Sequence, residues 1–553
     1  MKPQQQPEMM RHLLRKLESK GYVGGKDIES IASRLRIPSS RVYGFASQFD
    51  EFSKRPHKYV VRVCTGPACV LGGAEEVMDR LKEKVLDEVA IIPSPGLGHW
   101  HRSPALVVEP PKGEALLFEG LELSEIERLA SDISGGGISG GRPLTDVLPP
   151  KVEPVPGSSA SPWSIALERG SLPEGWGPDL VEWAASNPEE ALERIKGVIT
   201  ADRVDRREIL SPLEGAMEDR STAKVLVCNG VGGEVENSID YFLPLMNPRA
   251  VAAGALLAGV MCGAKHIIVY LSWRNGSAAE KMLKAVEELP TVKGMRISIF
   301  QGPEHIPSTL NIGRAAVVQG MMLWRAASLY GWEVPEIGTR SCLLLPADLA
   351  WKLPWLLQER GGGTSEWAGS RLVGIAGCMG GPRLVEVPAG MSPGEMISKL
   401  GLEPEGGDSF KALHLGGADA GPFPIDAAVD KGYEEGAEMV LLPSSTCMVR
   451  WALYLAQRAE RNCCGGCAPG RQAPAVAVEV IRAILRGEAD AEEGANLELL
   501  LASAGELAMC PRLEQILNPL LSSLRNFRDE FEAHAVEGTC KAGSCALLES
   551  AAT

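Results

Sequence analysis

Strands alternate with helices through the middle of this chain, and this pattern constrains its fold more than any other feature of the sequence. Short apolar strands are expected at residues 225–228, 266–271 and 296–301, with helices between them at 248–262 and 278–288. Such alternation predicts a mostly parallel sheet that is covered by helices on its faces. The chain has 553 residues, enough for about three to five domains, so we expect an α/β multidomain protein.

The rest of the chain divides into segments of different character. An N-terminal helical segment precedes a small unit of strands and helices, and a stretch rich in glycine and proline then predicts a linker. After the alternating region, a short strand-rich module leads into an almost wholly helical stretch, which predicts a bundle. We place these units at residues 1–57 (N-terminal helices), 58–133 (α/β unit), 134–162 (linker), 163–370 (alternating region), 371–430 (strand-rich module), 440–533 (helical bundle) and 534–553 (cysteine-containing tail).

Composition and charge exclude several classes of partner. The net charge of −15 disfavours binding to nucleic acid or to an anionic membrane. We find no run of about 18 apolar residues, so we expect no membrane insertion and predict a cytoplasmic protein. In that compartment, 13 cysteines indicate metal or redox chemistry rather than structural disulfides.

One group of cysteines has the spacing of metal ligands. Cys464 and Cys467 are separated by two residues just before a predicted helix, and Cys510 ends a later one. An iron–sulfur cluster needs thiolates from a short turn and a distant ligand that closes the cage. Gly465 and Gly466 would let the backbone pass close to the sulfides. Taken alone, the CxxC spacing also suits zinc or a redox dithiol.

The residues around these cysteines resemble the cluster domain of the FMN/NADH-binding subunit of respiratory complex I and its soluble relatives. The sequence reads TCMV at 446–449, CGGCAPGR at 464–471 and CP at 510–511. The resemblance implies a [4Fe-4S] cluster held by Cys464, Cys467 and Cys510. Gly470 stands where the family has its remaining cysteine, so the adjacent Cys463 is the expected substitute. Loss of the cluster, with these thiols as relics, is the alternative.

The resemblance extends upstream to the flavin loop of the same subunit. LVCNG at 226–230 precedes Gly233-Glu234, so Asn229 and Glu234 match the loop and are its candidate cofactor-binding remnants. No glycine-rich loop that could cradle a phosphate occurs at 190–222. The family's nicotinamide-contacting GEET motif is replaced by TLNI at 309–312. We therefore expect neither FMN nor NADH to bind tightly. A stretch that begins at Gly377 resembles the family's β-grasp module.

The N-terminal region resembles the thioredoxin-like subunit of the same complexes. CTGPAC at 64–69 matches the first half of that subunit's [2Fe-2S] motif, which implies Cys64 and Cys69 as cluster ligands. Gly96 and Trp100 stand where the second pair of cysteines belongs. His99 and His101 lie beside them and are conceivable ligands, because histidine replaces cysteine in Rieske centres. We expect this cluster to be absent.

The C-terminal tail carries a third group of metal-ligating residues. His534, Cys540 and Cys545 lie within twelve residues of one another, which suits a zinc site that lacks one ligand. Cys463 is the candidate for that ligand, and this role would remove it from the cluster. The tail resembles a segment of the hydrogenase and formate dehydrogenase versions of the family. A disordered terminus is the alternative.

These observations favour one function over two others. The expected function is an electron-transfer or assembly subunit of a multi-subunit NAD-linked oxidoreductase, which retains a [4Fe-4S] cluster and is not catalytic alone. Its partners would be iron–sulfur or flavin subunits of a hydrogenase, a formate dehydrogenase or a similar enzyme. The alternatives are a catalytic NADH:acceptor dehydrogenase that binds FMN in an atypical way, and a scaffold without any redox centre.

Overall fold

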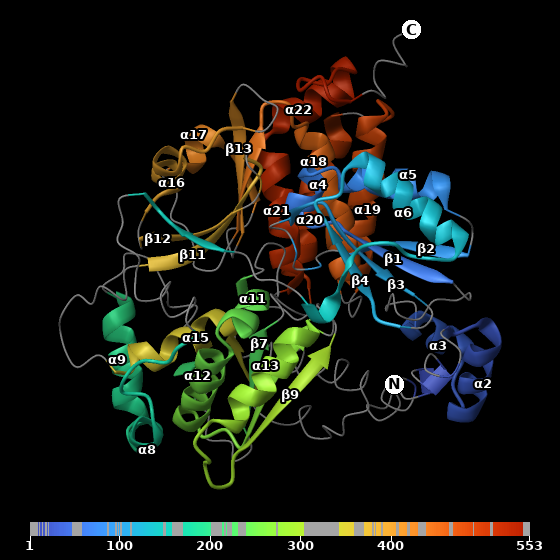
Figure 1. The fold of residues 1–553 in the computed structure, drawn as a ribbon. Coiled ribbons are helices and arrows are strands. Elements are labelled where there is room, and N and C mark those ends of the chain that lie inside the picture. Colours follow the sequence, from blue (N-terminus) through green and yellow to red (C-terminus); the bar gives the residue numbers. More distant parts are fainter. Residues whose placement is uncertain are drawn as a thin grey trace.

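Helices and strands in the computed structural model follow the order that the sequence predicts, from N-terminal helices to a C-terminal bundle (Figure 1). The structure describes most residues between 9 and 545. Apart from shorter gaps, the stretches outside the described residues are 1–8, 47–57, 147–150, 157–169, 201–212, 218–223, 231–238, 303–341, 359–369, 405–408, 417–420, 430–437, 464–467, 509–511 and 546–553.

The first described elements are helices, as predicted. Helices α2 (Gly25–Leu35) and α3 (Ser39–Ala46) pack against each other. Met9 and Leu13 are buried with Ile28 and Ile31 in a small separate core. The apolar stripes at helical spacing thus form the contact surface between these helices.

A five-stranded sheet forms the core of the thioredoxin-like region. Its strands are β1 (Tyr59–Cys64), β2 (Val89–Ser94), β3 (Ala105–Glu109), β4 (Leu116–Glu119) and β5 (Arg142–Pro143), arranged in the order β2-β1-β3-β4-β5. Strand β1 is parallel to β2, and the other neighbours are antiparallel. The helices of this region are α4 (Pro67–Leu71), α5 (Ala74–Lys84) and α6 (Leu123–Gly135). The four-residue strand β4 was not predicted, because so short a run carries little periodic signal.

The middle of the chain forms the predicted parallel sheet. Strands β7 (Val225–Gly230), β8 (His266–Ser272), β9 (Arg296–Gly302) and β10 (Cys342–Pro346) lie in the order β10-β7-β8-β9 and are all parallel. The helices around them are α8 (Pro178–Ser186), α9 (Pro188–Thr200), α11 (Ile239–Met246), α12 (Pro248–Met261), α13 (Gly276–Glu287) and α15 (Ala347–Leu356). This arrangement confirms the α/β fold class.

Helix α12 is the buried centre of this region. Every residue from 250 to 261 is buried, as expected of a helix that is apolar on all sides. A Cβ atom at Gly254 would lie 1.6 Å from the carbonyl oxygen of Ala350, so α12 and α15 cross almost backbone to backbone. Among the described residues, no single helix has the length and apolar character needed to cross a membrane. Helices α11 and α12 are long and apolar enough only when they are taken together, and the chain bends by 107° between them.

A third sheet joins distant parts of the sequence. It contains β6 (Val152–Pro154), β11 (Ser370–Ala376), β12 (Arg383–Pro388), β13 (Phe410–Leu415), β14 (Gly421–Pro424) and β15 (Glu438–Pro443), in the order β14-β13-β15-β11-β12-β6. Helices α16 (Pro393–Leu400) and α17 (Ile425–Ala428) accompany it. The sheet therefore reaches beyond the predicted module at 371–430 at both ends.

The segment predicted to be a linker is partly structured, and this expectation needs correction. Within 134–162, β5 pairs with β4, a short 3₁₀ turn follows at η2 (Leu144–Asp146), and β6 pairs in parallel with β12. The strands have two and three residues, too few to show an alternating pattern. Their pairing comes from tertiary contacts that the local sequence does not encode.

Residues 448–537 form the predicted helical bundle. It consists of α18 (Met448–Asn462), α19 (Ala468–Leu485), α20 (Ala491–Glu506), α21 (Arg512–Asn526) and α22 (Arg528–Glu532), followed by a π-helical turn, η4 (Ala533–Glu537). Helices α21 and α22 are separated at Phe527, which is the N-cap of α22. The bundle also contacts the third sheet, where Ser522 donates a hydrogen bond to the Pro422 carbonyl (2.8 Å).

Candidate metal centre

Cys447 lies at the point where the third sheet meets the bundle. It immediately precedes α18, and its carbonyl accepts the first hydrogen bond of that helix from Trp451 N–H (3.0 Å). The buried Glu530 carboxylate accepts a hydrogen bond from Met448 N–H (3.0 Å) and pairs with Lys411 Nζ (2.9 Å). These contacts fix the start of α18, and with it the position of the buried Cys447 side chain.

His534 comes from the turn η4 on the far side of this site. The side chain is fully buried. Its Nδ1 lies 2.8 Å from the backbone carbonyl of Glu530, and a carbonyl can only accept, so Nδ1 carries a proton. The other ring nitrogen, Nε2, lies 3.5 Å from Cys447 Sγ. This is the arrangement of a metal-binding histidine, whose second nitrogen is held by a backbone carbonyl.

Cys540 and Cys545 bracket a turn at the end of the described chain. Gly543 N–H donates to the Cys540 carbonyl (2.9 Å), and Gly543 has φ +64°, a conformation that favours glycine. Arg450 of α18 reaches the Ser544 carbonyl (3.4 Å). The turn therefore lies against the start of α18, and it presents both sulfurs to the same point.

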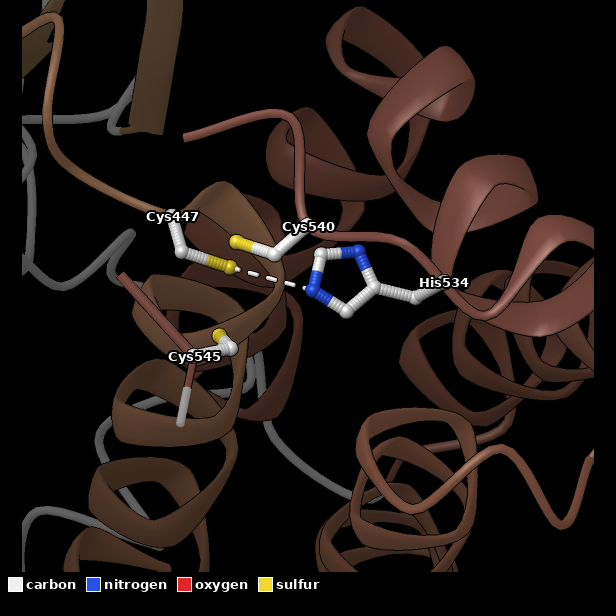
Figure 2. A group of neighbouring side chains, drawn as sticks. All are labelled: Cys447, His534, Cys540 and Cys545. Carbon is white, nitrogen blue, oxygen red and sulfur yellow. Dashed lines mark hydrogen bonds between the residues drawn. The ribbon is translucent and has the colours of Figure 1, made fainter. Parts of the chain in front are cut away.

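Together these residues form a closed set of four ligands. The three sulfurs and the imidazole of His534 converge on one point (Figure 2), and the four ligand atoms all lie within 4.8 Å of one another. Tetrahedral zinc with Zn–S bonds of about 2.3 Å would set its sulfurs about 3.8 Å apart. In a [4Fe-4S] cluster each thiolate binds a different iron, so its sulfurs enclose a cube instead of one ion. The observed set fits a single tetrahedral ion.

The charges of these groups are strongly coupled. The hydrogen bond from the Cys545 thiol, with help from His534, lowers the pKa of Cys447 to about 4 despite its burial. The same contact raises the pKa of Cys545 well above its usual range. Burial disfavours the charged form of His534, but its hydrogen bonds with Cys447 and the Glu530 carbonyl raise its pKa to about 9. The set already holds one thiolate, and a cation that binds there would release protons.

The structure brings together three predicted ligands and adds one that was not predicted. His534, Cys540 and Cys545 were expected to share a zinc site, and their ligand atoms do meet. The fourth position is taken by Cys447, whereas Cys463 caps the opposite end of the same helix α18. At 1.5 Å per residue, these two cysteines lie roughly 24 Å apart along the helix. Cys447 does lie in the TCMV stretch at 446–449, but nothing in that stretch connects it with the cysteines of the tail.

The other candidate site residues are distributed as follows. Cys464, Cys467, Cys510 and Glu234 lie outside the described residues, so their roles stay predictions. Cys463 is half-buried at the end of α18, next to the undescribed stretch 464–467. Asn229 is buried near the carboxyl end of β7.

The thioredoxin-like candidates are only partly described. Cys64 ends β1 and Cys69 lies in α4, and both are buried. His99 is buried, whereas His101 and the two positions that lack cysteine lie outside the described residues.

Two family models match regions of this chain. Residues 1–90 match the thioredoxin-like [2Fe-2S] ferredoxin, and residues 450–534 match the NADH-ubiquinone oxidoreductase-F iron-sulfur binding region. The chain thus combines regions similar to two kinds of subunit, and the resemblance expected from the sequence is confirmed. Cys447, Cys540 and Cys545 fall outside the iron–sulfur match, and His534 is its last residue.

Curated relatives extend the similarity over more than half of the chain. The NADP-reducing hydrogenase subunit HndC of Solidesulfovibrio fructosivorans is 25% identical over 362 residues, 60% of this chain and 73% of that protein. An NADH-quinone oxidoreductase subunit of Rhizobium meliloti (strain 1021) is 25% identical over 350 residues, 57% of this chain and 82% of that protein. This chain is therefore similar to subunits of NAD(P)H-linked oxidoreductases.

A solved structure shows that the fold is shared over nearly the whole length. The crystal structure of NAD⁺-reducing [NiFe]-hydrogenase in the H₂-reduced state matches with a TM-score of 0.72 and 16% sequence identity, covering 94% of this chain and 92% of the matched chain. At this identity the match establishes the fold alone.

Proposed function

We propose that this chain is an electron-transfer and assembly subunit of a multi-subunit NAD-linked oxidoreductase, with one [4Fe-4S] cluster and one structural zinc ion. The iron–sulfur match at 450–534 and the spacing of Cys464, Cys467 and Cys510 support the cluster. Cys463 is our candidate for its fourth ligand. The partners would be iron–sulfur or flavin subunits of a hydrogenase, a formate dehydrogenase or a similar enzyme. A cytoplasmic location stays a prediction.

The observation that carries the zinc assignment is the closed ligand set. Four protein ligands leave no open coordination position, which is typical of structural zinc and not of catalytic zinc. The ligands come from the start of α18 and from the last described residues of the chain, 87 and more positions apart. Zinc would therefore fasten the C-terminal tail to the bundle. An iron–sulfur cluster at these four residues is the alternative.

The remaining cofactor sites would be degenerate in this proposal. Asn229 remains from the flavin loop, while the glycine-rich loop and the GEET motif are missing from the sequence. A catalytic NADH:acceptor dehydrogenase with atypical flavin binding is the second candidate function, which the identity of the relatives favours. A scaffold without redox centres is the third.

Metal and flavin analysis of the anaerobically purified full chain tests the three candidate functions. Our proposal expects about four irons and about one zinc per chain, a broad iron–sulfur absorbance and no flavin bands. Flavin retained at near one per chain after gel filtration would instead support the catalytic function. Iron near zero would leave only the scaffold. Iron in place of zinc, lost on replacing Cys545 by serine, would show that the closed ligand set holds a cluster.

A further inference from the structure

Lys411 connects the third sheet with the candidate metal centre, and the function proposed above gives it no role. It belongs to β13, and its Nζ donates two hydrogen bonds, one to the Thr446 carbonyl (2.7 Å) and one to Glu530 Oε1 (2.9 Å). None of these three residues supplies a ligand atom. Thr446, however, directly precedes the ligand Cys447, and Glu530 lies four residues before the ligand His534. The two residues that Lys411 joins are therefore next to two of the four ligands.

The Lys411–Glu530 pair holds the backbone on both sides of Cys447. The carbonyl of the peptide group before Cys447 accepts a hydrogen bond from Lys411, and the peptide N–H after it, that of Met448, donates to Glu530 Oε2 (3.0 Å). Each peptide group is planar, so holding both groups sets the direction of the Cα–Cβ bond of Cys447. Only rotation about that bond then remains to place the Sγ atom.

Glu530 also orients a second ligand, His534. Its backbone carbonyl lies 2.8 Å from Nδ1 of the imidazole, which leaves Nε2 as the nitrogen that faces Cys447 Sγ, 3.5 Å away. The side chain and the main chain of one residue thus hold a sulfur ligand and the nitrogen ligand toward each other. Residues that orient metal ligands in this way typically contribute a factor of about 10 to 100 to metal affinity.

Burial makes each charge of the pair dependent on the other. The side chains of Glu530 and Lys411 are 6% and 20% exposed. Removing one partner from a buried ion pair leaves an uncompensated charge and is strongly destabilising, whereas replacing both partners by neutral groups is often tolerated. Loss of either charge should therefore disturb the backbone around Cys447 more than loss of both.

We infer that Lys411 and Glu530 are positioning residues of the proposed zinc centre, through which the third sheet sets how tightly the metal is held. This inference rests on the zinc ion of the proposed function. The pair acts on Cys447 and His534, the two ligands that lie outside the turn at 540–545. It prepares one half of the site, and the two sulfurs of that turn complete it.

Zinc affinities of full-length variants test this role. Equilibrium dialysis against buffers of defined free zinc, followed by elemental analysis, gives the zinc dissociation constant of each chain. Lys411→Met and Glu530→Gln should each raise that constant by about 10- to 100-fold. The double variant Lys411→Met/Glu530→Gln leaves no unpaired charge, and its amide can still accept the Met448 N–H. It should therefore bind zinc more tightly than either single variant.

Glu498→Gln is the matched control, because it breaks ion pairs of similar exposure in the same bundle. The Glu498 side chain is 23% exposed and pairs with Arg525 and Arg528, each at 2.9 Å, which joins α20 to α21 and α22. In the described part of the chain, these ion pairs involve no ligand of the metal centre. The variant should lower the melting temperature and leave the zinc dissociation constant within about fivefold of wild type.

Three results would overturn the inference. One is a zinc dissociation constant that rises by less than about tenfold in Lys411→Met. Another is a double variant in which the two single effects simply add, because the residues would then act independently. The third is an equal loss of affinity in Glu498→Gln, which would make the effect one of general stability. If Lys411→Met does not fold, as judged by circular dichroism, Glu530→Gln takes its place in these comparisons.

The proposed zinc centre and this inference can fail separately. Wild type that holds zinc, loses it in Cys545→Ser and keeps its full affinity in Lys411→Met would leave the zinc centre standing and refute the positioning pair alone. Wild type that binds no zinc at these ligands would refute both.

Discussion

Replacing Cys447 by serine should empty the proposed zinc centre and release the C-terminal tail. The substitution removes one of four ligands whose donor atoms lie within 4.8 Å of one another. Besides the proposed metal, the turn at 540–545 is attached through the buried Cys545, against whose core Cys540 and Ala542 pack, and through two weak polar contacts. Lys541 pairs with Asp529 on the exposed surface (2.8 Å), and Arg450 reaches Ser544 at 3.4 Å. Zinc would therefore add the strongest polar attachment of this turn, and two of its ligands would be residues of the turn itself.

The size of the effect follows from linkage between metal binding and docking of the tail. At a free zinc concentration about a thousandfold above the dissociation constant, bound zinc stabilises the docked state by about 4.1 kcal/mol. That energy corresponds to a factor of about one thousand in the docking equilibrium. Amide hydrogen exchange in residues 539–545 should therefore accelerate by up to about a thousandfold in Cys447→Ser, and by the same factor in wild type stripped of zinc.

The assay combines elemental analysis with hydrogen-exchange mass spectrometry. Cys463→Ser is the matched control, because Cys463 lies at the other end of the same helix α18. It should keep about one zinc per chain and a protected tail, although its iron content should fall if it ligates the cluster. Our reasoning would be refuted if Cys447→Ser retained zinc and tail protection, or if Cys463→Ser lost them.

Three further predictions concern the middle region and the bundle. Burial, followed by the charge of Asp348, raises the pKa of Asp240 to about 8. Between about pH 4 and pH 8 the native state therefore holds a proton on Asp240 that the unfolded state has lost. The free energy of unfolding should fall by about 1.4 kcal/mol for each pH unit across this range. Asp240→Asn can still accept the Asp348 N–H (2.7 Å) and should flatten this slope in melts recorded across that range. Gly254→Ala should lower the free energy of unfolding by about 3 kcal/mol or more, because the new Cβ would meet the Ala350 carbonyl. An unchanged melting temperature would contradict the close crossing of α12 and α15. Gly494→Ala, in open space on α20, should instead stabilise by about 0.5–1 kcal/mol in the same melts.

Long periodic elements were the part of this fold that the sequence predicted well. Strands β7, β8 and β9 and helix α12 agree with the expected ranges to within one or two residues. Strands β7 and β8 and helix α12 are buried over most of their length, so their apolar residues form runs that can be read directly from the local sequence. The short strands β5 and β6 were missed for the opposite reason, since two or three residues cannot display a period.

In the metal centre, the ligands that are close in sequence could be predicted, and the distant ligand could not. Cys540 and Cys545 are close in sequence, with His534 six residues earlier, so their association could be predicted. Cys447 lies 87 positions before His534, and it meets the tail only because the carboxylate and the carbonyl of Glu530 hold the start of α18 and His534 together. Sequence adjacency favoured Cys463, which the length of α18 separates from this point. No local pattern could choose correctly between the two ends of one helix.

Strand β6 determines where the chain could be divided into two separately expressed pieces. It lies between the thioredoxin-like region and the middle α/β region in sequence, yet it pairs along β12 at the border of the third sheet. If the chain were expressed as two pieces separated after β6, the second piece would present β12 with unpaired backbone groups. Such an open border invites pairing with other chains and aggregation. A cut before β6 would keep β12 paired and leave only the three-residue β6 as the edge strand. The chain should therefore be divided before β6 and not after it.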